Sequence, residues 1–491
     1  MSSNGSLEGG EYNSSSSQHQ MRHHSSLQVY LTFMDEFMGS TGGWQLIVVG
    51  FAIALGLSSI MGVIPQVTTQ RYAELLHNYE GASCSRFDGA DRPAACIAGG
   101  EDAQNAASYS TMGRNIVSLL CNSVVGSYSD VHGRKGVQIV SLFFLSISPL
   151  LLILMQVNKS MSPTWYYAFD TCTTMISFMS VSFSALSDTL PARHRAASFG
   201  LFMGAFYAGI SIGPFITTLI KNHLYATIFS FAIRFSGVLF AIFVLPETLP
   251  EEVAKHNREK VDNNTADDSN LVIGTILRPF KEMRILFRNR SLILITIGCF
   301  LGKFVFSADV SLFFYYVENV LGVRDKDVAG LMLASGIAGI LVQAVFLKYL
   351  ILLMGEHLLL VASYISGVVH NLVYGLARTK ALLYVGICLA QTTGASGPLL
   401  HSAVSRNVDP TEQGRIQGSL AALTALSEAI GPVFINYVYR NWHFFGQGTM
   451  FVVAAVLYFL GTIAVYHIPP KTASSSTTQD EESSDSSKES T

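Results

Sequence analysis

Charged residues are scarce in this sequence. Only 13% of its 491 residues are Asp, Glu, Lys or Arg, whereas about 25% is typical of soluble proteins. Hydrophobic residues make up 49% of the chain, and its mean hydropathy is +0.38. Such a chain is too apolar for an ordinary soluble domain, and its composition predicts a polytopic membrane protein.

Signatures of several other protein classes are missing as well. The formal net charge is only -3, and no basic patch is interleaved with aromatic residues, which argues against nucleic-acid binding. The six cysteines show neither CxxC spacing nor nearby histidine pairs, so zinc and thioredoxin-like chemistry have no support. A Walker phosphate loop is also lacking, which disfavours ATP-driven transport. We expect neither a cofactor nor a metal site.

The two ends of the chain are polar. Residues 1–40 are rich in Ser, Asn, Gln and His and do not contain a signal peptide. Residues 470–491 are rich in Ser, Thr and acidic residues. We predict that both segments are disordered cytoplasmic tails. The cluster of His19, His23 and His24 could bind a metal, but a solvated polar tract is the simpler interpretation.

Long apolar runs fill the rest of the chain. About twelve of them reach the roughly 20 residues that a helix needs to cross a bilayer. The predicted spans are 44–67, 108–128, 137–157, 165–187, 196–220, 226–245, 291–318, 328–350, 357–376, 382–402, 416–438 and 449–468. Trp44, Trp165 and Trp442 fall at predicted span ends, where amphipathic rings prefer the headgroup level. The expected fold class is therefore all-α, with twelve transmembrane helices.

Two longer polar connections predict the topology. Residues 246–290 are rich in Lys and Arg and should stay in the cytoplasm, with both termini and the turn 126–135 on the same side. Residues 72–107 should then face the outside or an organelle lumen. Cys84 and Cys96 lie in this loop, where a disulfide is plausible in an oxidising compartment and two free surface thiols are the alternative.

An internal repeat divides the chain. An offset of 218 residues superposes Ala185 on Ala403, Ser187 on Ser405, Gly200 on Gly418, Gly213 on Gly431 and Pro214 on Pro432. We infer two six-helix halves, residues 41–245 and 291–469, joined by a cytoplasmic linker, residues 246–290. Repeated halves are typical of secondary transporters, whose site lies near the bilayer midplane between the repeats.

A short charged turn separates two of the apolar runs. Its sequence is Gly126-Ser-Tyr-Ser-Asp130-Val-His-Gly133-Arg134-Lys135. Gly126 would let two helix ends approach closely, and Gly133 would supply the backbone angles of a tight turn. The charges of Asp130, Arg134 and Lys135 could form pairs at the membrane surface. A solvated loop with positive-inside charges is the alternative.

Together these motifs resemble the major facilitator superfamily, in particular its tetracycline-efflux-type drug/proton antiporters and the hippocampus-abundant-transcript-like proteins. The charged turn is similar to the superfamily's signature between helices 2 and 3. Further matching motifs are Ser162-Pro-x-Trp165, Ser187-Asp188, Arg195, Gly200, Gly213-Pro214, Leu245 to Glu251, Ser405-Arg406, Gln413-Gly414, Gln417-Gly418 and Gly431-Pro432. The resemblance covers roughly residues 44–469 and implies the major facilitator fold.

The resemblance implies a gating role for the charged turn. Asp130 would face the N-terminal end of helix 11, where the helix dipole favours an anion, and Arg134 would pair with Asp188. These contacts would latch the two halves in an outward-open state. The remaining residues of the predicted latch are Gly126, Gly133, Lys135 and Arg195.

The sequence also departs from the family pattern. Gly209, Gly213 and Pro214 resemble the antiporter signature of helix 5, and with Gly431 and Pro432 they form a predicted helix-packing motif. The usual small residues after this signature are replaced by larger ones. Helix 1 lacks the acidic residue that tetracycline exporters carry, and the second-half counterpart of the charged turn is degenerate, with Lys348, Gly355, Glu356 and His357.

Charged groups inside the predicted spans need a reason, since each costs on the order of 3 kcal/mol. Glu428 is the main candidate for a proton carrier, and a glutamate bonded to neighbouring hydroxyls is the alternative. Lys303 could contact an anionic solute group, whereas Asp309 should lie nearer the outer rim. His401 could couple transport to protons. Arg114 is expected to snorkel to the headgroups, and lining the cavity mouth is the alternative.

The sequence thus predicts a monomeric secondary transporter, with alternating access, proton coupling and a small organic solute. It should reside in the plasma membrane or in an endolysosomal or vacuolar membrane. The alternative is a non-transporting receptor or trafficking scaffold that uses the 72–107 loop or the tails to bind partners. A membrane enzyme is disfavoured, because the sequence shows neither a nucleophile–base pair nor a metal constellation.

Overall fold

The computed structural model describes residues 32–86, 93–220, 222–264, 278–321, 325–442 and 444–469. Almost all of these residues are helical, and the predicted all-α fold class is confirmed. The short strand β1, Phe444–Gln447, is the single β element in the described part. The histidines His19, His23 and His24 and the predicted tail after residue 469 lie outside the described residues.

The first half begins with α2 and ends with α9. Its elements are α2 (Gly43–Ser59), α3 (Val63–Leu76), η1 (Cys84–Arg86), α4 (Ala94–His132), α5 (Arg134–Val157), α6 (Thr164–Cys172), α7 (Phe178–Thr189), α8 (Ala192–Leu219) and α9 (His223–Phe243). The linker contains α10 (Glu251–Asn264) and η4 (Arg284–Phe287).

The second half begins with α12 and ends with α19. Its elements are α12 (Arg290–Leu321), α13 (Asp325–Ile340), the π-helical η5 (Leu341–Phe346), α14 (Leu347–Met354), α15 (Glu356–Leu376), α16 (Lys380–Gly394), α17 (Ser396–Ser405), η6 (Pro410–Glu412), α18 (Gln413–Asn441), β1 and α19 (Thr449–Tyr466).

Eight helices in the described part are long and apolar enough to cross a membrane, or nine if the bent pair Thr32–Gly39 and Gly43–Ser59 forms one span. The predicted count of twelve is therefore not fully confirmed. The predicted spans 44–67, 165–187 and 382–402 are each divided between two shorter helices, and 108–128 lies in the long but polar α4. Such breaks are tolerated at membrane depth where protein rather than lipid surrounds them.

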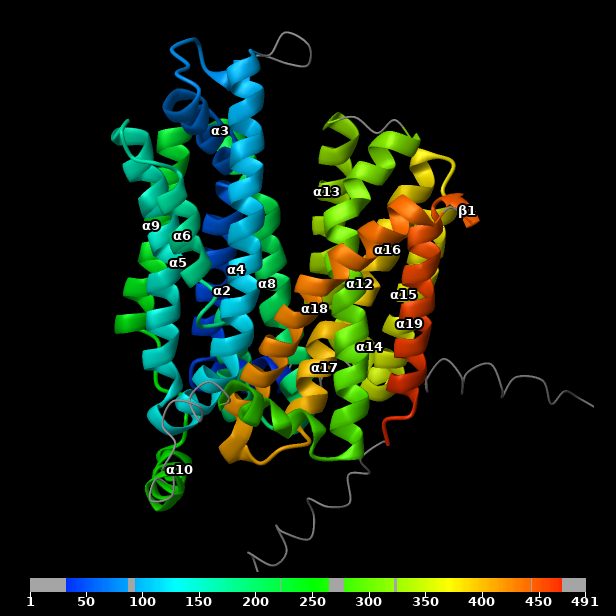
Figure 1. Cartoon of the computed structure of the whole chain (residues 1–491). Coiled ribbons are helices and arrows are strands. Elements are labelled where there is room, and N and C mark those ends of the chain that lie inside the picture. The colour runs from blue at the N-terminus through cyan, green and yellow to red at the C-terminus, as the bar shows by residue number, and fades with distance from the viewer. Residues whose placement is uncertain are drawn as a thin grey trace, which may run out of the picture.

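The two halves lie side by side in Figure 1, with the first half in blue to green on the left and the second in green to red on the right. They converge at the lower end, where α4 and α8 lie against α18 and α17, and they diverge toward the upper end. We call the lower end, which carries α10, the linker end. The upper end carries the connection from α3 to α4, and we call it the disulfide end.

Glycines of the predicted packing motif bring helices into backbone contact within each half. A Cβ atom on Gly209 would lie 2.7 Å from the carbonyl oxygen of Phe51, so α8 can pack closely on α2 only without a side chain there. A Cβ atom on Gly431 would overlap the carbonyl oxygen of Phe304 in the same way, on α18 against α12. Small residues at such crossings are a usual feature of membrane helix packing.

The predicted disordered tail, residues 1–40, extends too far. Residues Thr32–Gly39 form a short helix that meets α2 at an angle of 82°. Phe33 and Phe37, one helical turn apart, are 2% and 0% exposed and join the apolar core of the first half. The prediction was wrong here because the polar residues before the helix dominate the composition of the segment, whereas two aromatic side chains are enough to anchor one helical turn.

A disulfide between Cys84 and Cys96 is present, as predicted, with 5.6 Å between the two Cα atoms. Both cysteines are buried, at 2% and 0% exposure, and they pack with Ala73 and Tyr79. The bond joins η1 to the first turn of α4. It therefore constrains the connection that crosses the disulfide end.

Replacing Cys84 by Ser should destabilise this end of the molecule. Closing a loop of this size contributes about 3 kcal/mol, so the purified Cys84→Ser variant should unfold at a lower temperature than the native chain under non-reducing conditions. Cys388→Ser removes an exposed free thiol and serves as the control. Equal melting temperatures for Cys84→Ser and the native chain would contradict a stabilising role for the bond.

Candidate functional site

The charged turn at the linker end is shaped by Gly133. This residue has φ +101°, and a Cβ atom on it would meet the carboxylate of Glu247. Glu247 accepts hydrogen bonds from the backbone N–H groups of Arg134 (2.8 Å) and Lys135 (3.1 Å) at the start of α5. The carboxylate thus caps the N-terminus of α5, where a negative charge is favourable. The sequence analysis matched the segment around Glu247 to the family but missed this capping role.

Arg134 lies at the centre of a buried charge cluster and is 1% exposed. Its guanidinium donates from Nε to Asp188 at 2.8 Å and from an Nη atom to Asp130 at 2.6 Å. A third hydrogen bond runs to the hydroxyl of Ser129 at 2.6 Å. Two carboxylates surround one cation, so the cluster carries excess negative charge that a low-dielectric site must offset.

The N-terminus of α18, in the other half, stabilises this excess negative charge. The carboxylate of Asp130 accepts hydrogen bonds from the backbone N–H groups of Gly414 (2.6 Å) and Arg415 (2.7 Å). These N–H groups lie in the first turn of α18, where they lack intrahelical partners and the helix dipole is positive. The cluster therefore bonds the first half to the second. We call Asp130, Arg134 and Asp188 with the first turn of α18 the first latch.

Glycines allow the two helices of the first latch to approach. A Cβ atom on Gly126 would overlap the carbonyl oxygen of Gly414, and one on Gly418 would overlap that of Asn122. The backbones of α4 and α18 are in direct contact at this crossing. Without this contact, Asp130 could not reach the start of α18.

Serines related by the 218-residue repeat meet between the halves. The hydroxyl oxygens of Ser405 and Ser187 lie 3.1 Å apart. Arg195 donates to the hydroxyl of Ser405 at 2.9 Å, and Ser405 in turn donates to Gln413 at 2.6 Å. Two copies of one repeat position can touch only near the axis that relates the halves. The structure thus places the pseudo-twofold axis beside the first latch.

A charge-reversed pair occupies the corresponding place in the second half. The repeat superposes Arg406 on Asp188, and Glu356 follows Gly355 (φ +80°) as Arg134 follows Gly133. The side chains of Glu356 and Arg406 form an ion pair, and Arg406 donates to the carbonyl oxygen of Ala192 in the first half at 2.9 Å. This second-half turn, described as degenerate from the sequence, therefore keeps a latch with its charges exchanged. We call this pair the second latch.

The short helix Thr32–Gly39 adds a further contact between the halves. Glu36 pairs with Arg193 (3.0 Å) and His194 (3.1 Å) at the start of α8. Lys348 of the second half lies 3.1 Å from the other ring nitrogen of His194 and 4.7 Å from the ring centroid of Phe33. A segment predicted as a disordered tail thus bridges α8 and α14.

The linker also closes over the first latch. Asn257 of α10 donates to the backbone oxygens of Asp130 (2.8 Å) and Thr411 (3.0 Å), which belong to different halves. The carboxylate of Glu282, just before η4, forms an ion pair with Arg415 at 2.7 Å. The linker end can therefore open only if the contacts between the linker and at least one half are broken.

Three of the predicted solute or proton residues gather near the centre of the second half. Lys303 on α12 and Glu428 on α18 both lie close enough to the buried Cys299 to act on its thiol. His401 on α17 lies within the electrostatic reach of Lys303 and donates a hydrogen bond from Nδ1 to Oε1 of Gln417 at 2.5 Å. Its ring centroid is 4.3 Å from that of Phe183 of the first half, with the ring planes tilted by 48°. The cluster thus faces the first half.

Asp309 lies away from these three residues. It is partly buried, and its Oδ2 atom is 3.5 Å from Nε2 of His370, which is 3% exposed. The sequence analysis expected Asp309 near the outer rim and gave His370 no specific role. The pairing was missed because the two residues are 61 positions apart.

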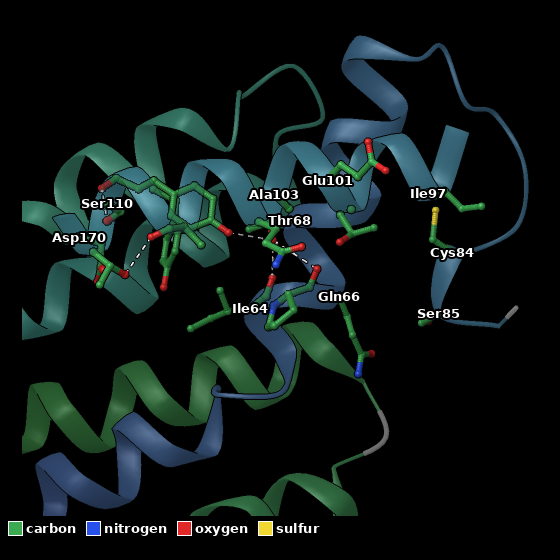
Figure 2. Close-up of a pocket in the computed structure, with 18 of the residues that line it drawn as sticks. Ile64, Gln66, Thr68, Cys84, Ser85, Ile97, Glu101, Ala103, Ser110 and Asp170 are labelled. Atoms are coloured by element: carbon green, nitrogen blue, oxygen red, sulfur yellow. Dashed lines mark hydrogen bonds between the residues drawn. The ribbon is translucent and has the colours of Figure 1, made fainter. Parts of the chain in front are cut away.

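Arg114 lines a cavity at the disulfide end rather than extending alone to the headgroups. It pairs with Asp170 at 3.2 Å, and both line a cavity of about 740 Å³ between α3, α4 and α6. Figure 2 shows Asp170 and Ser110 at one side of this cavity and Glu101 and the disulfide loop at the other. This size suits a drug-sized molecule. The described residues contain no group of three or more His, Cys, Asp or Glu side chains that could hold a metal ion.

Comparisons with known proteins give a consistent picture. The family profile of the Major Facilitator Superfamily matches residues 46–432. The human hippocampus abundant transcript 1 protein is 23% identical over 336 residues, which are 67% of this chain and 65% of that protein. The class H tetracycline resistance protein of Pasteurella multocida is 25% identical over 355 residues, 71% of this chain and 83% of that protein. The match thus spans about two thirds of the length of the first relative.

A solved structure shows the same fold. The crystal structure of the human organic anion transporter MFSD10 (TETRAN) superposes with a TM-score of 0.69 and covers 86% of this chain and 98% of that chain. The sequence identity is 18%, so this likeness describes the fold and not the solute.

Neutralising Asp130 should loosen the linker end. Hydrogen bonds to a charged group contribute about 1.5–3 kcal/mol, so Asp130→Asn should lower the ratio of closed to open molecules by about tenfold or more. Ser184 is 1% exposed and bonds the backbone of Gln413 across the halves. A cysteine introduced by Ser184→Cys, in a background without the free cysteines, should therefore be alkylated correspondingly faster in the Asp130→Asn variant.

The control for this measurement is Glu251→Gln. Glu251 lies at the same end but pairs with Lys255 in an exposed position, where ion pairs contribute little. Its alkylation rate should match that of the unmodified chain. An unchanged rate in Asp130→Asn would show that the first latch does not hold this end closed.

Proposed function

The chain belongs to the Major Facilitator Superfamily, and from this premise we propose that it is a secondary active transporter that moves a small organic solute by alternating access, driven by protons. The observation that carries the proposal is the contact between Ser187 and Ser405, which are equivalent positions of the two repeats. Halves that meet on their symmetry axis at one end and diverge at the other are arranged to rock about a site between them.

Its orientation follows from charge. The linker is rich in Lys and Arg, and such segments remain in the cytoplasm. The linker end is then cytoplasmic, and the disulfide bond faces an oxidising outside or lumenal space. In this orientation the two latches close the cytoplasmic side, and the arrangement in Figure 1 corresponds to the outward-facing state of the cycle.

Because of the latches, the linker end switches between a closed and an open state and does not open gradually. Asp130 bonds the first turn of α18 only while Gly126 and Gly418 hold α4 and α18 in contact, and Arg134 is satisfied only beside both carboxylates. Partial opening would leave buried charges without partners, which is strongly unfavourable. Packed interfaces of this kind switch between two states.

The centre of the second half supplies groups for solute and protons. Lys303 can neutralise an anionic group of the solute, and its ammonium group lies 5.4 Å from the ring centroid of Phe306, so an aromatic surface is close by. Glu428 is the group in this cluster that can exchange a proton, and His401 lies between the cluster and the first half. The relative named for tetracycline resistance favours an amphipathic organic solute.

Flux measurements test this function. The purified protein is placed in lipid vesicles with an imposed pH gradient and offered a panel of amphipathic organic anions and tetracycline. We expect at least one compound to move with the gradient, and Glu428→Gln to lower gradient-driven flux by about tenfold while exchange of solute without a gradient persists.

The exposed Glu251→Gln variant is again the matched control and should transport like the unmodified chain. If gradient-driven flux survives Glu428→Gln undiminished, Glu428 does not carry the proton. If no compound of a broad panel moves, the proposed function fails and a receptor or scaffold with the same fold becomes the better account.

A further inference from the structure

Four polar side chains form a cluster inside the second half, away from Lys303 and Glu428. Asp309 lies on α12, His370 and Asn371 lie on α15, and Thr393 lies on α16. Oδ2 of Asp309 is 3.5 Å from Nε2 of His370 and 3.4 Å from Nδ2 of Asn371. The cluster thus connects three helices of the second half.

The carboxyl group of Asp309 differs from four carboxylates described above. Asp130, Asp188, Asp170 and Glu356 each form an ion pair with an arginine. Among the side chains that the structure describes, the sole basic partner of Asp309 is His370. The side chains of Asp309 and His370 are only 15% and 4% exposed. The charge of this site therefore depends on whether the pair holds a proton.

The hydrogen-bond partners of His370 indicate which of its ring nitrogens carries the proton. Nε2 accepts from the amide of Asn371 at 2.9 Å, so the ring proton lies on Nδ1, which faces the carbonyl oxygen of Ser366 (3.1 Å) and Thr393 (3.2 Å). A proton on Oδ2 of Asp309 can point at Nε2, where it competes with the amide of Asn371 for the one lone pair of that nitrogen. A bare carboxylate would face the lone pair of that nitrogen.

Asn371 is placed to respond to this proton. Its Nδ2 atom also donates to the carbonyl oxygen of Gly367 at 3.1 Å, whereas its buried Oδ1 atom has no hydrogen-bond partner. Unpaired buried acceptors are costly. If the proton moves from Asp309 to Nε2, a turned amide can offer Oδ1 to the imidazolium, so the unpaired atom gains a donor.

Resting on the proposed function, we propose that Asp309 and His370 form one protonatable unit that gains and loses a proton during the transport cycle. With the proton the unit is neutral, and without it the unit carries one buried negative charge. A net charge at this depth is costly, so the two forms differ in how well the surrounding helices tolerate them.

Among the side chains that the structure describes, no other group near Asp309 is placed to take over this role at moderate pH. The rings of Tyr374 and Tyr458 pack edge-on against His370, with centroids at 5.3 and 5.8 Å. Cys388 of α16 is close enough to act on Tyr374, and phenols and thiols ordinarily ionise only at about pH 8.5–10. Lys303 lies six residues before Asp309 on α12, about 9 Å along the helix axis, and is the nearest described lysine or arginine on that helix.

The Asp309–His370 unit is connected to the linker end through α16 and α17, which are separated by a break at Ala395. Thr393, which bonds His370, is followed after one residue by the break at Ala395, and α17 continues from there to Ser405 and Arg406. Ser405 bonds Ser187 on the symmetry axis, and Arg406 belongs to the second latch. A shift of Thr393 at the unit can thus change the direction of α17 and the contacts at its end.

Protonation can be measured without any solute. Infrared difference spectra of the purified chain in lipid nanodiscs, recorded between about pH 5 and pH 8, should show the carbonyl band of a protonated carboxyl group that disappears as pH rises. The spectra are recorded in a Glu428→Gln background, so that the proposed proton carrier contributes no band. In this background the band should be lost in Asp309→Asn and shifted in frequency and midpoint in His370→Gln. Asp170→Asn changes a membrane carboxylate that pairs with an arginine, and it should leave the band unchanged.

The coupling to conformation is measured on the same variants. Spin labels at Tyr225 and Leu376, exposed positions on opposite halves at the disulfide end, report the separation of the halves. One proton changes a two-state ratio by at most about tenfold per pH unit, and we expect a pH-dependent ratio in the native chain and in Asp309→Glu, but none in Asp309→Asn.

A carboxyl band that survives Asp309→Asn, or an unaltered pH dependence of the label distances in that variant, would overturn the proposal. Asp309→Glu keeps a protonatable group, so its behaviour separates loss of the proton from damage to the fold. Titration of the band in a chain that moves no solute would support the unit and would count against the proposed transport instead.

Discussion

The burial of Arg134 between Asp130 and Asp188 is the constraint on which the rest of the structure depends. Three charges in a site that is almost closed to solvent are tolerable only when each has its partners, and the excess negative charge requires the N–H groups at the start of α18. That requirement fixes where α18 begins and how close it lies to α4. It also explains why glycines stand at Gly126 and Gly418, since any larger residue would separate the helices.

The second half contains a related ion pair at the position equivalent to the first latch. The two halves meet at Ser187 and Ser405. On each side of that contact, a turn residue forms an ion pair with a residue at the C-terminal end of a helix of its own half, α7 in the first half and α17 in the second. In the first half the turn supplies the arginine, and in the second half it supplies Glu356. Exchanged charges preserve the pair while the sequences diverge, so both halves contribute ion pairs to closure of the linker end. The first latch remains the larger, because Asp130 adds hydrogen bonds to the first turn of α18.

The sequence was sufficient for features that rest on local pattern. Apolar runs predicted the helices, the turn from Gly126 to Lys135 predicted the region of the first latch, and the position of two cysteines in one loop predicted their disulfide. Features that depend on pairing across the chain were harder. The Glu356–Arg406 pair was missed because a search for the residue types of the first turn does not find a pair with exchanged charges. The pairing of Asp309 with His370 was missed because residues 61 positions apart give no local signal of contact.

Alternating access at these latches is tested most directly by two distances measured in one variant. Labels at Phe243 and Leu353 report the linker end, and labels at Tyr225 and Leu376 report the disulfide end, all at exposed positions on opposite halves. Replacing Arg134 by Gln removes the central cation of the first latch. The account predicts that the distance at the linker end becomes longer while the distance at the disulfide end becomes shorter. A longer distance at the linker end with no change at the disulfide end would contradict rocking of the halves, and two unchanged distances would contradict the latch.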